Sequence, residues 1–211
     1  MINSDFRVIN GWVIFFLSFV LFSCEDSKDT SPILKVEGGE ILRIDSFMSD
    51  YVDVKRLDIW IPPSYNLSEK MGVLYMHDGQ ALFDGTTTWN GQEWGVDEYF
   101  TSKGVDQKYI VVGVWNAGPN RWTEYFPEKA LDYMDEDSLE ILKSTGMDTI
   151  FDKLSADKYL KFLVEELKPY IDTTFYVNTD REHTAIMGSS MGGLVSWYSA
   201  IEYPEIFGTA L

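Results

Sequence analysis

Apolar residues in this chain follow two spacings, one typical of buried strands and one typical of helices. Three short, mostly apolar runs have the continuity of strands covered on both faces: Val73 to Met76, Tyr109 to Val114 and Thr184 to Met187. Three longer segments place apolar residues three and four positions apart, which predicts helices: Trp94 to Phe100, Lys158 to Ile171 and Met191 to Ile201. Because the two kinds of element alternate, we predict an α/β fold with a mostly parallel sheet.

The stretch from Glu40 to Pro62 has a different pattern, in which apolar residues occupy every second position. This alternation predicts antiparallel strands, and therefore an antiparallel N-terminal edge to the sheet. The phase of the alternation slips by one between Val54 and Leu57, which indicates a bulge. Pro62-Pro63 is expected to end the last of these strands.

The segment from Ala130 to Leu154 fits neither spacing and is rich in acidic residues. Its carboxylates are Asp132, Asp135, Glu136, Asp137, Glu140, Asp148 and Asp152. The spacing of Asp135 and Asp137 occurs in calcium loops, but the glycine and the terminal glutamate of an EF-hand are not in place. We therefore expect a solvated acidic surface segment and no metal site.

The first 23 residues have the pattern of an export signal. Arg7 supplies a short basic region, and Gly11 to Phe22 is an almost wholly apolar run that is too short to span a bilayer. The run ends in Leu21-Phe22-Ser23-Cys24, which resembles a bacterial lipobox and implies cleavage before Cys24 and acylation of that residue. The alternative is an ordinary secretory signal with an incidental cysteine.

This interpretation divides the chain into a signal peptide (residues 1–23), a polar tether (residues 24–39) and one domain (residues 40–211). Cys24 is the only cysteine, so no disulfide can form within the chain, and acylation explains a lone cysteine in an exported protein. We expect a lipid-anchored protein of the bacterial cell envelope, in the periplasm or at the cell surface.

Charge limits the classes of partner. The chain has 17 Lys plus Arg against 34 Asp plus Glu, a formal net charge of -17. Such a surface repels phosphate backbones, so we expect no nucleic-acid partner; the acidity otherwise serves solubility. A hydrophobic content of 45% and an aromatic content of 15% are sufficient for one domain with a sizeable core.

The most informative motif is Gly188-Ser189-Ser190-Met191-Gly192, a Gly-x-Ser-x-Gly sequence between a predicted buried strand and a predicted helix. In that context the motif predicts a nucleophile elbow, a sharp strand-to-helix turn that exposes the hydroxyl of Ser190. The backbone N–H of Met191 would then face the nucleophile and could donate to an oxyanion. The alternative is a glycine-rich turn with a buried serine.

A second motif, His77-Asp78-Gly79-Gln80, follows the strand that ends at Met76. Together with Trp60-Ile61-Pro62-Pro63-Ser64-Tyr65 and the elbow, it makes the chain from about Ile41 onward resemble a family of esterases. That family includes esterase D, feruloyl and acetylxylan esterases, enterochelin-type esterases and mycolyltransferases. The resemblance is specific at the elbow and at Asp78-Gly79-Gln80, and loose across the acidic segment.

The resemblance implies an α/β-hydrolase fold, a three-layer sandwich that hydrolyses esters without a metal or an organic cofactor. It also implies that the backbone N–H of Gln80 is the second oxyanion donor, unless the loop is an ordinary turn. Triads on this fold run in the order serine, acid, histidine. We therefore expect the acid and the histidine beyond Leu211, and we expect the 211-residue chain to be truncated and inactive by itself.

The chain has two histidines that could act as the base. His183 precedes the strand that ends before Gly188, so it is expected at the opposite edge of the sheet. His77 lies at the correct end of its strand but comes before Ser190 in the chain. A role in shaping the oxyanion loop is therefore expected for His77, with a role as base as the alternative.

Aromatic and polar residues follow the strand from Tyr109 to Val114, at the same sheet edge as Ser190. Trp115, Asn116, Arg121 and Trp122 could form a platform for a sugar or an aromatic acyl group. Alternatively, they pack the acidic segment onto the domain.

These observations favour an exported carboxylic-ester hydrolase with Ser190 as the nucleophile, acting on an acylated polysaccharide or a related extracellular ester. Within enzymes, the alternative is a siderophore esterase of the enterochelin type. A different alternative is a surface binding protein that kept the fold without turnover. The expected partners are the ester substrate and, through the lipid on Cys24, the membrane.

Overall fold

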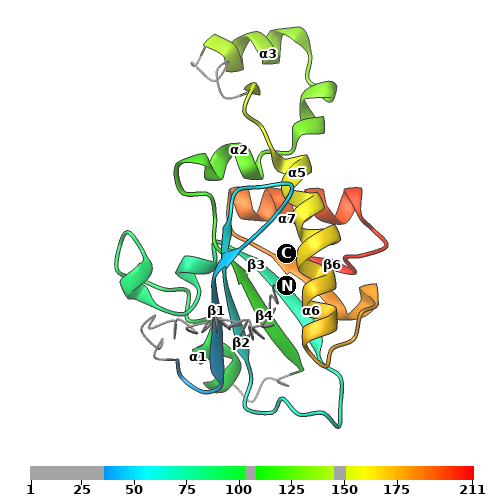
Figure 1. Cartoon of the computed structure of the whole chain (residues 1–211). Coiled ribbons are helices and arrows are strands. Elements are labelled where there is room, and N and C mark those ends of the chain that lie inside the picture. The colour runs from blue at the N-terminus through cyan, green and yellow to red at the C-terminus, as the bar shows by residue number, and fades with distance from the viewer. Residues whose placement is uncertain (1–35, 103–107, 145–150) are drawn as a thin grey trace, which may run out of the picture. The chain divides into compact units, whose positions relative to one another are not determined.

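A computed structural model describes residues 36–102, 108–144 and 151–211 (Figure 1). Contacts divide the chain into Met1–Pro32 and Ile33–Leu211, and the described residues all belong to the second unit. The predicted signal peptide, Cys24 and most of the predicted tether therefore lie outside the described residues. In the described ranges, no helix has both the length and the hydropathy needed to cross a membrane.

One mixed sheet organises the domain. Its strands are β1 (Glu40–Phe47), β2 (Lys55–Ile61), β3 (Gly72–His77), β4 (Tyr109–Val114), β5 (Thr184–Met187) and β6 (Thr209–Ala210). Their order across the sheet is β1-β2-β4-β3-β5-β6. β1 and β2 run antiparallel to their neighbours, whereas β4, β3, β5 and β6 are parallel to one another. The predicted parallel sheet with an antiparallel N-terminal edge is confirmed.

Helices connect the strands. They are α1 (Val96–Ser102), α2 (Arg121–Tyr125), α3 (Glu136–Leu142), α5 (Ala156–Lys161), α6 (Lys168–Thr174) and α7 (Met191–Glu202). Shorter 3-10 segments are η1 (Gly79–Ala81), η2 (Gly85–Thr87), η3 (Gly118–Asn120), η4 (Glu128–Tyr133) and η7 (Arg181–His183). α5 continues into α6 through η6 (Phe162–Leu167), which has π-helical hydrogen bonding and therefore contains more residues per turn.

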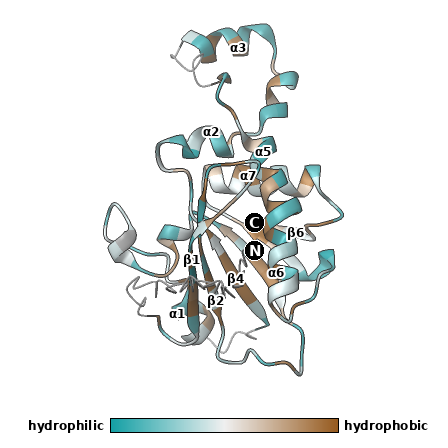
Figure 2. Cartoon of the chain, in the orientation of Figure 1, coloured by the Kyte–Doolittle hydropathy of each residue, from teal (hydrophilic) through white to brown (hydrophobic). Residues whose placement is uncertain are grey.

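Helices cover both faces of the sheet (Figure 1). On one face, Tyr159 and Leu163 of the α5–η6 segment and Val195 of α7 pack against Ile186 and other strand residues. On the other face, a smaller cluster includes Val96 of α1 and Trp60, whose ring stacks on Phe100. Figure 2 shows hydrophobic residues along the strands and mainly hydrophilic residues over α2 and α5. The three-layer arrangement agrees with the predicted α/β-hydrolase sandwich.

The predicted N-terminal strands differ from the structure in one respect. Val52 and Val54 lie in the connection between β1 and β2, where Val54 is 51% exposed, and the pairing irregularity falls between Ile44 and Phe47. Because Ile44 pairs with Leu57 and Phe47 pairs with Lys55, this irregularity lies opposite the position predicted for a bulge, and its extra residue is in β1. Alternating apolar residues also occur in an exposed turn, so the pattern alone extended the strands too far.

The acidic segment contributes η4 and α3 and then leads into α5. None of the residues of α3 is buried, and the Asp135 carboxylate caps this helix by accepting from the Ser138 N–H at 2.7 Å. Asp148 lies outside the described residues.

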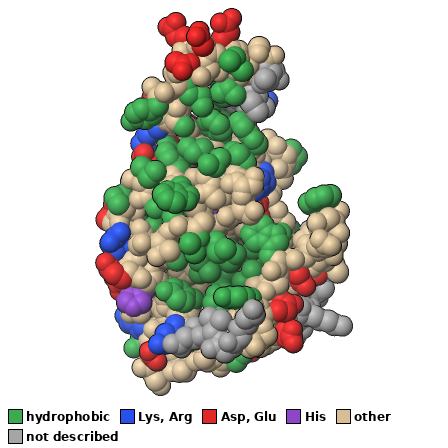
Figure 3. Space-filling view, turned by 180° about the vertical axis from the view of Figure 1, so that it is seen from behind, with side chains coloured by type: hydrophobic (Ala, Val, Ile, Leu, Met, Phe, Trp, Pro, Cys, Tyr) green, Lys and Arg blue, Asp and Glu red, His purple; other side chains and the backbone are tan. Residues whose placement is uncertain are grey.

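Figure 3 shows one face of the chain on which hydrophobic side chains gather near the centre and acidic side chains lie mainly towards its edges.

A buried ion pair joins the sheet to α2. Lys55, at the start of β2, binds the carboxylate of Glu124, and the two side chains are only 3% and 4% exposed. Burial raises the pKa of Glu124, and the Lys55 ammonium opposes that shift. Because both charges have lost most of their water, each depends on the other for solvation.

Replacing Lys55 with Met is therefore expected to lower the free energy of unfolding by about 3–5 kcal/mol, since it leaves the Glu124 carboxylate buried without a counter-charge. Urea unfolding of the two proteins at neutral pH measures this difference. The double variant Lys55→Met/Glu124→Leu should recover most of the loss.

The matched control is Lys129→Met, because the pair between Lys129 and Glu202 is half exposed and should contribute little. If Lys55→Met unfolds at the same urea concentration as the unaltered protein, the buried pair does not stabilise the fold.

Candidate active site

Three strand ends form the candidate site. In the sheet, Met76 of β3 pairs with Met187 of β5, and His77 pairs with Val114 of β4. Because these strands are parallel and in register, the loops that follow them leave the sheet side by side at one edge. In α/β folds this edge is the usual position of a binding site.

Ser190 lies at a strained turn between β5 and α7. Its backbone has φ 57° and ψ -118°, a conformation that costs about 1–3 kcal/mol for a residue other than glycine. The side chain is exposed at the first turn of α7. A Cβ on Gly188 would lie 2.5 Å from the carbonyl carbon of Gly192, so the turn requires glycine at position 188. This is the geometry predicted for a nucleophile elbow.

The predicted oxyanion donors flank this turn. Met191 is the first residue of α7, where backbone N–H groups have no partner within the helix and the helix dipole favours negative charge. Gln80 lies in η1, directly after β3, and β3 is the neighbour of β5. The structure therefore brings the Gln80 and Met191 segments to the same sheet edge as Ser190.

Asp78 connects these loops. Asp78 adopts a left-handed backbone conformation with φ 59°, and it is buried, with 4% of its surface exposed. Its carboxylate accepts from Arg121 Nε at 2.6 Å, from Arg121 Nη2 at 2.7 Å and from Asn116 Nδ2 at 2.7 Å. Arg121 Nη2 also donates to the carbonyl of Ser189 at 3.3 Å. The ion pair between Asp78 and Arg121, together with the hydrogen bonds from Asn116 and to the Ser189 carbonyl, thus links the loops that follow β3, β4 and β5.

Gly192 lies where α7 meets the Asp78 loop. An added Cβ at position 192 would lie 3.4 Å from both Asp78 Oδ2 and His77 Cβ. These are ordinary van der Waals distances, so the first turn of α7 lies directly against the Asp78 loop.

The four predicted substrate contacts have separate structural roles. The polar groups of Asn116 and Arg121 hold Asp78, as described above. Trp115 Nε1 donates to Asp58 at 2.8 Å, and the Arg43 and Arg56 guanidinium groups lie over its ring. Trp122 stacks on Phe126 at 4.9 Å between ring centroids.

Three of the four nevertheless line a cavity, namely Trp115, Asn116 and Arg121. Trp122 does not line it; the ring of its stacking partner Phe126 packs against Phe151, at the end of the acidic segment. The position of Trp122 therefore fits the alternative in which aromatic residues pack that segment onto the domain.

Neither histidine is hydrogen-bonded to Ser190 in the described ranges. His77 is buried between Tyr125 and Tyr159, and its Nδ1 lies 2.9 Å from the Tyr159 hydroxyl. Burial lowers the pKa of His77 to about 3, so the ring stays neutral and is a weak base. His183 lies at the other end of β5, where it is half exposed and its Nδ1 contacts the carboxylate of Asp180. Neither described histidine is therefore placed to act as the base for Ser190.

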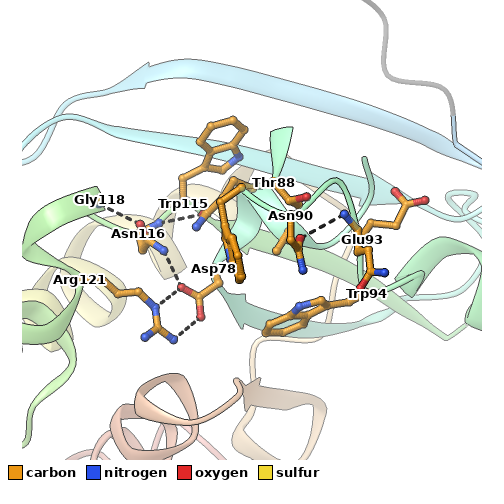
Figure 4. A pocket seen from close by; sticks show the side chains of 13 residues that line it. Asp78, Thr88, Asn90, Glu93, Trp94, Trp115, Asn116, Gly118 and Arg121 are labelled. Carbon is orange, nitrogen blue, oxygen red and sulfur yellow. Dashed lines mark hydrogen bonds and ion pairs between the residues drawn. The ribbon is translucent and has the colours of Figure 1, made fainter. Parts of the chain in front are cut away.

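A cavity of about 720 Å³ opens beside the Asp78 loop (Figure 4). Asp78, Asn116 and Arg121 lie on one side of it, and Trp94 and Glu93 lie on the other. The sequence interpretation placed Trp94 at the start of a helix, but α1 begins at Val96, and Trp94 lines the cavity instead. The density of aromatic and amide side chains from Trp89 to Trp94 is the signal that could have identified this wall.

Comparison with known proteins gives a fold and a family match over part of the chain. Residues 149–211 match the family described as "Putative esterase". The uncharacterized protein YbbA of Bacillus subtilis is 24% identical over 155 residues, which cover 73% of this chain and 54% of that protein. The chain thus spans about half the length of this relative.

Solved structures of esterases have a similar fold. A ferulic acid esterase from Anaeromyces mucronatus aligns with a TM-score of 0.52 and 16% identity, over 83% of this chain and 58% of that one. The enterobactin esterase of Shigella flexneri aligns with a TM-score of 0.53 and 14% identity, over 83% of this chain and 37% of that one. The chain therefore has the α/β-hydrolase fold, and its predicted resemblance to this esterase family is confirmed.

Proposed function

We propose that the protein is a carboxylic-ester hydrolase with Ser190 as its nucleophile. The observation that carries this proposal is the backbone of Ser190, held at φ 57° and exposed at the start of α7, beside the Asp78–Gln80 loop. Strain of this kind persists where the surrounding structure imposes it, and it is concentrated at functional sites. The similarity to esterases of the same fold supports the reaction class.

In the proposed reaction, Ser190 Oγ forms a bond to the ester carbonyl carbon while its proton passes to a base. The carbonyl oxygen becomes an oxyanion that accepts hydrogen bonds from the N–H groups of Gln80 and Met191. The bond to the alcohol then breaks, and the alcohol leaves with the proton. Water attacks the acyl-serine in the same way and releases the carboxylic acid.

The base and its acid partner are proposed to be a histidine and an Asp or Glu in a part of the protein that follows Leu211. Neither described histidine is hydrogen-bonded to Ser190, and the order serine, acid, histidine is typical of this fold. The reaction as proposed uses no metal or organic cofactor.

The proposed substrate is an acylated polysaccharide or a related extracellular ester. A neighbour in fold is a ferulic acid esterase, which supports a carboxylic ester such as a feruloyl ester as the substrate. The enterobactin esterase neighbour supports a siderophore ester as the second candidate. We also propose that Cys24 carries the lipid that anchors the protein in the cell envelope.

The first test compares the complete gene product with its Ser190→Ala variant. Ester hydrolysis should fall to the residual rate that binding and the oxyanion donors provide, because attack requires the hydroxyl. The assay follows p-nitrophenyl acetate, and circular dichroism checks that the variant is folded. If Ser190→Ala keeps full activity, the protein is not a serine hydrolase of this kind.

The 211-residue chain serves as the companion measurement. It should hydrolyse the same ester no faster than its own Ser190→Ala variant, since neither described histidine is hydrogen-bonded to the serine. Turnover that depends on both Ser190 and His77 would contradict the proposed position of the base.

A second test addresses the oxyanion donor at Gln80. In the complete gene product, Gln80→Pro removes the N–H and should lower the rate by about two orders of magnitude or more, since one donor contributes ~3 kcal/mol. Gln80→Ala keeps the N–H and should have a much smaller effect. Equal damage by both changes in folded protein would assign the role to the side chain.

A third test addresses the anchor. Cys24→Ser should leave an uncleaved or soluble precursor, because the acylated residue is removed. Phase separation in a mild detergent measures the fraction that partitions with the membrane. Unchanged partitioning of the variant would contradict the lipoprotein proposal.

A further inference from the structure

We propose that the cavity beside the Asp78 loop binds a neutral, hydroxyl-rich sugar portion of the substrate, with Trp94 and Trp89 as its stacking surfaces. The proposal rests on the proposed ester hydrolysis for the position of the reacting bond. It narrows the proposed substrate to an ester of a neutral sugar and names residues that recognise the sugar.

The aromatic residues of the cavity are open to solvent. Trp94 is 42% exposed and Trp89 is 97% exposed, although burial of such a side chain is strongly favoured. Both line the cavity. An open indole face offers a flat apolar surface with a polar edge, which suits the C–H face of a pyranose ring. A loop on the ligand-binding edge of the sheet is also where recognition residues are commonly found.

Amide groups on the same loop are available for hydroxyl groups. Gln92 and Asn90 line the cavity with Trp94, and the Oδ1 of Asn90 accepts from the Gln92 backbone N–H at 3.1 Å. In the described part of the chain, no hydrogen bond engages the side-chain amide of Gln92 or the Nδ2 of Asn90. Such groups both donate and accept, as sugar hydroxyls do.

The charges around the cavity disfavour an anionic ligand. Arg121 is the cation of the lining, and its guanidinium is already paired with Asp78. Glu93 lies on the opposite wall, where burial and the nearby carboxylates of Glu98 and Asp84 raise its pKa. With Arg121 neutralised, the lining has a net negative charge at neutral pH. A uronic acid or a trianionic ferric catecholate would therefore be repelled.

Binding can be measured separately from catalysis. The experiment uses the full chain with Ser190→Ala, which prevents turnover, and titrates it calorimetrically with xylohexaose, cellohexaose and mannohexaose as neutral probes. Hexagalacturonate and a ferric tris-catecholate complex are the anionic probes. We expect at least one neutral probe to bind and both anions to bind more weakly. Trp94→Ala should weaken binding of the neutral probe by about tenfold.

Trp197→Ala is the matched control, because Trp197 is 62% exposed on α7 and does not line the cavity. This control should bind as the parent does, and Glu93→Gln should reduce the discrimination against hexagalacturonate. The proposal is overturned if no neutral probe binds, if the anions bind as well as the sugars, or if Trp94→Ala binds like the control.

Failure of the proposed function would give a different result. In that case the complete gene product would lack Ser190-dependent hydrolysis while the oligosaccharide titrations still showed Trp94-dependent binding. Conversely, Ser190-dependent hydrolysis without sugar binding would retain the esterase and reject this inference.

Discussion

The ion pair between Asp78 and Arg121 is the interaction on which the candidate site depends. Asp78 is held in a left-handed conformation, and its buried carboxylate needs hydrogen-bond donors from neighbouring segments of the chain. Arg121 supplies two and also contacts the Ser189 carbonyl, while Asn116 supplies a third. The planar guanidinium fixes direction as well as distance, so the loop after β3 is oriented relative to the elbow after β5.

The two walls of the cavity differ in how they are held. The wall that contains Asp78 and Asn116 is built on strand ends and cross-linked by charged hydrogen bonds. The wall that contains Trp94 belongs to a loop whose aromatic side chains are open to solvent. Catalysis requires that the reacting groups be held in fixed positions, whereas substrate binding tolerates an adaptable protein surface. This division agrees with a reaction centred on the strand ends and a substrate class set by the loop.

The sequence predicted the parallel strands and the turn at Ser190 well, because both have local signatures. The runs at β4 and β5 matched the observed bounds, and glycines around Ser190 marked a turn that large side chains cannot make. The ion pair between Asp78 and Arg121 was not predicted, since the two residues are 43 positions apart and a pairing of that kind has no periodic pattern. Trp94 was assigned to a helix because its spacing fits one, although spacing does not reveal which face is left open.

The π-helical turn η6 has a consequence for the register of the whole segment from Ala156 to Thr174. A turn of this kind holds one more residue than an α-helical turn, so it sets the rotation of α5 relative to α6. Each residue in an α-helix turns the chain by about 100°. Loss of one residue from Phe162–Leu167 would therefore rotate Tyr159 away from His77, although no residue at the site itself had changed. Chain length at this turn, and not only residue identity, is under constraint.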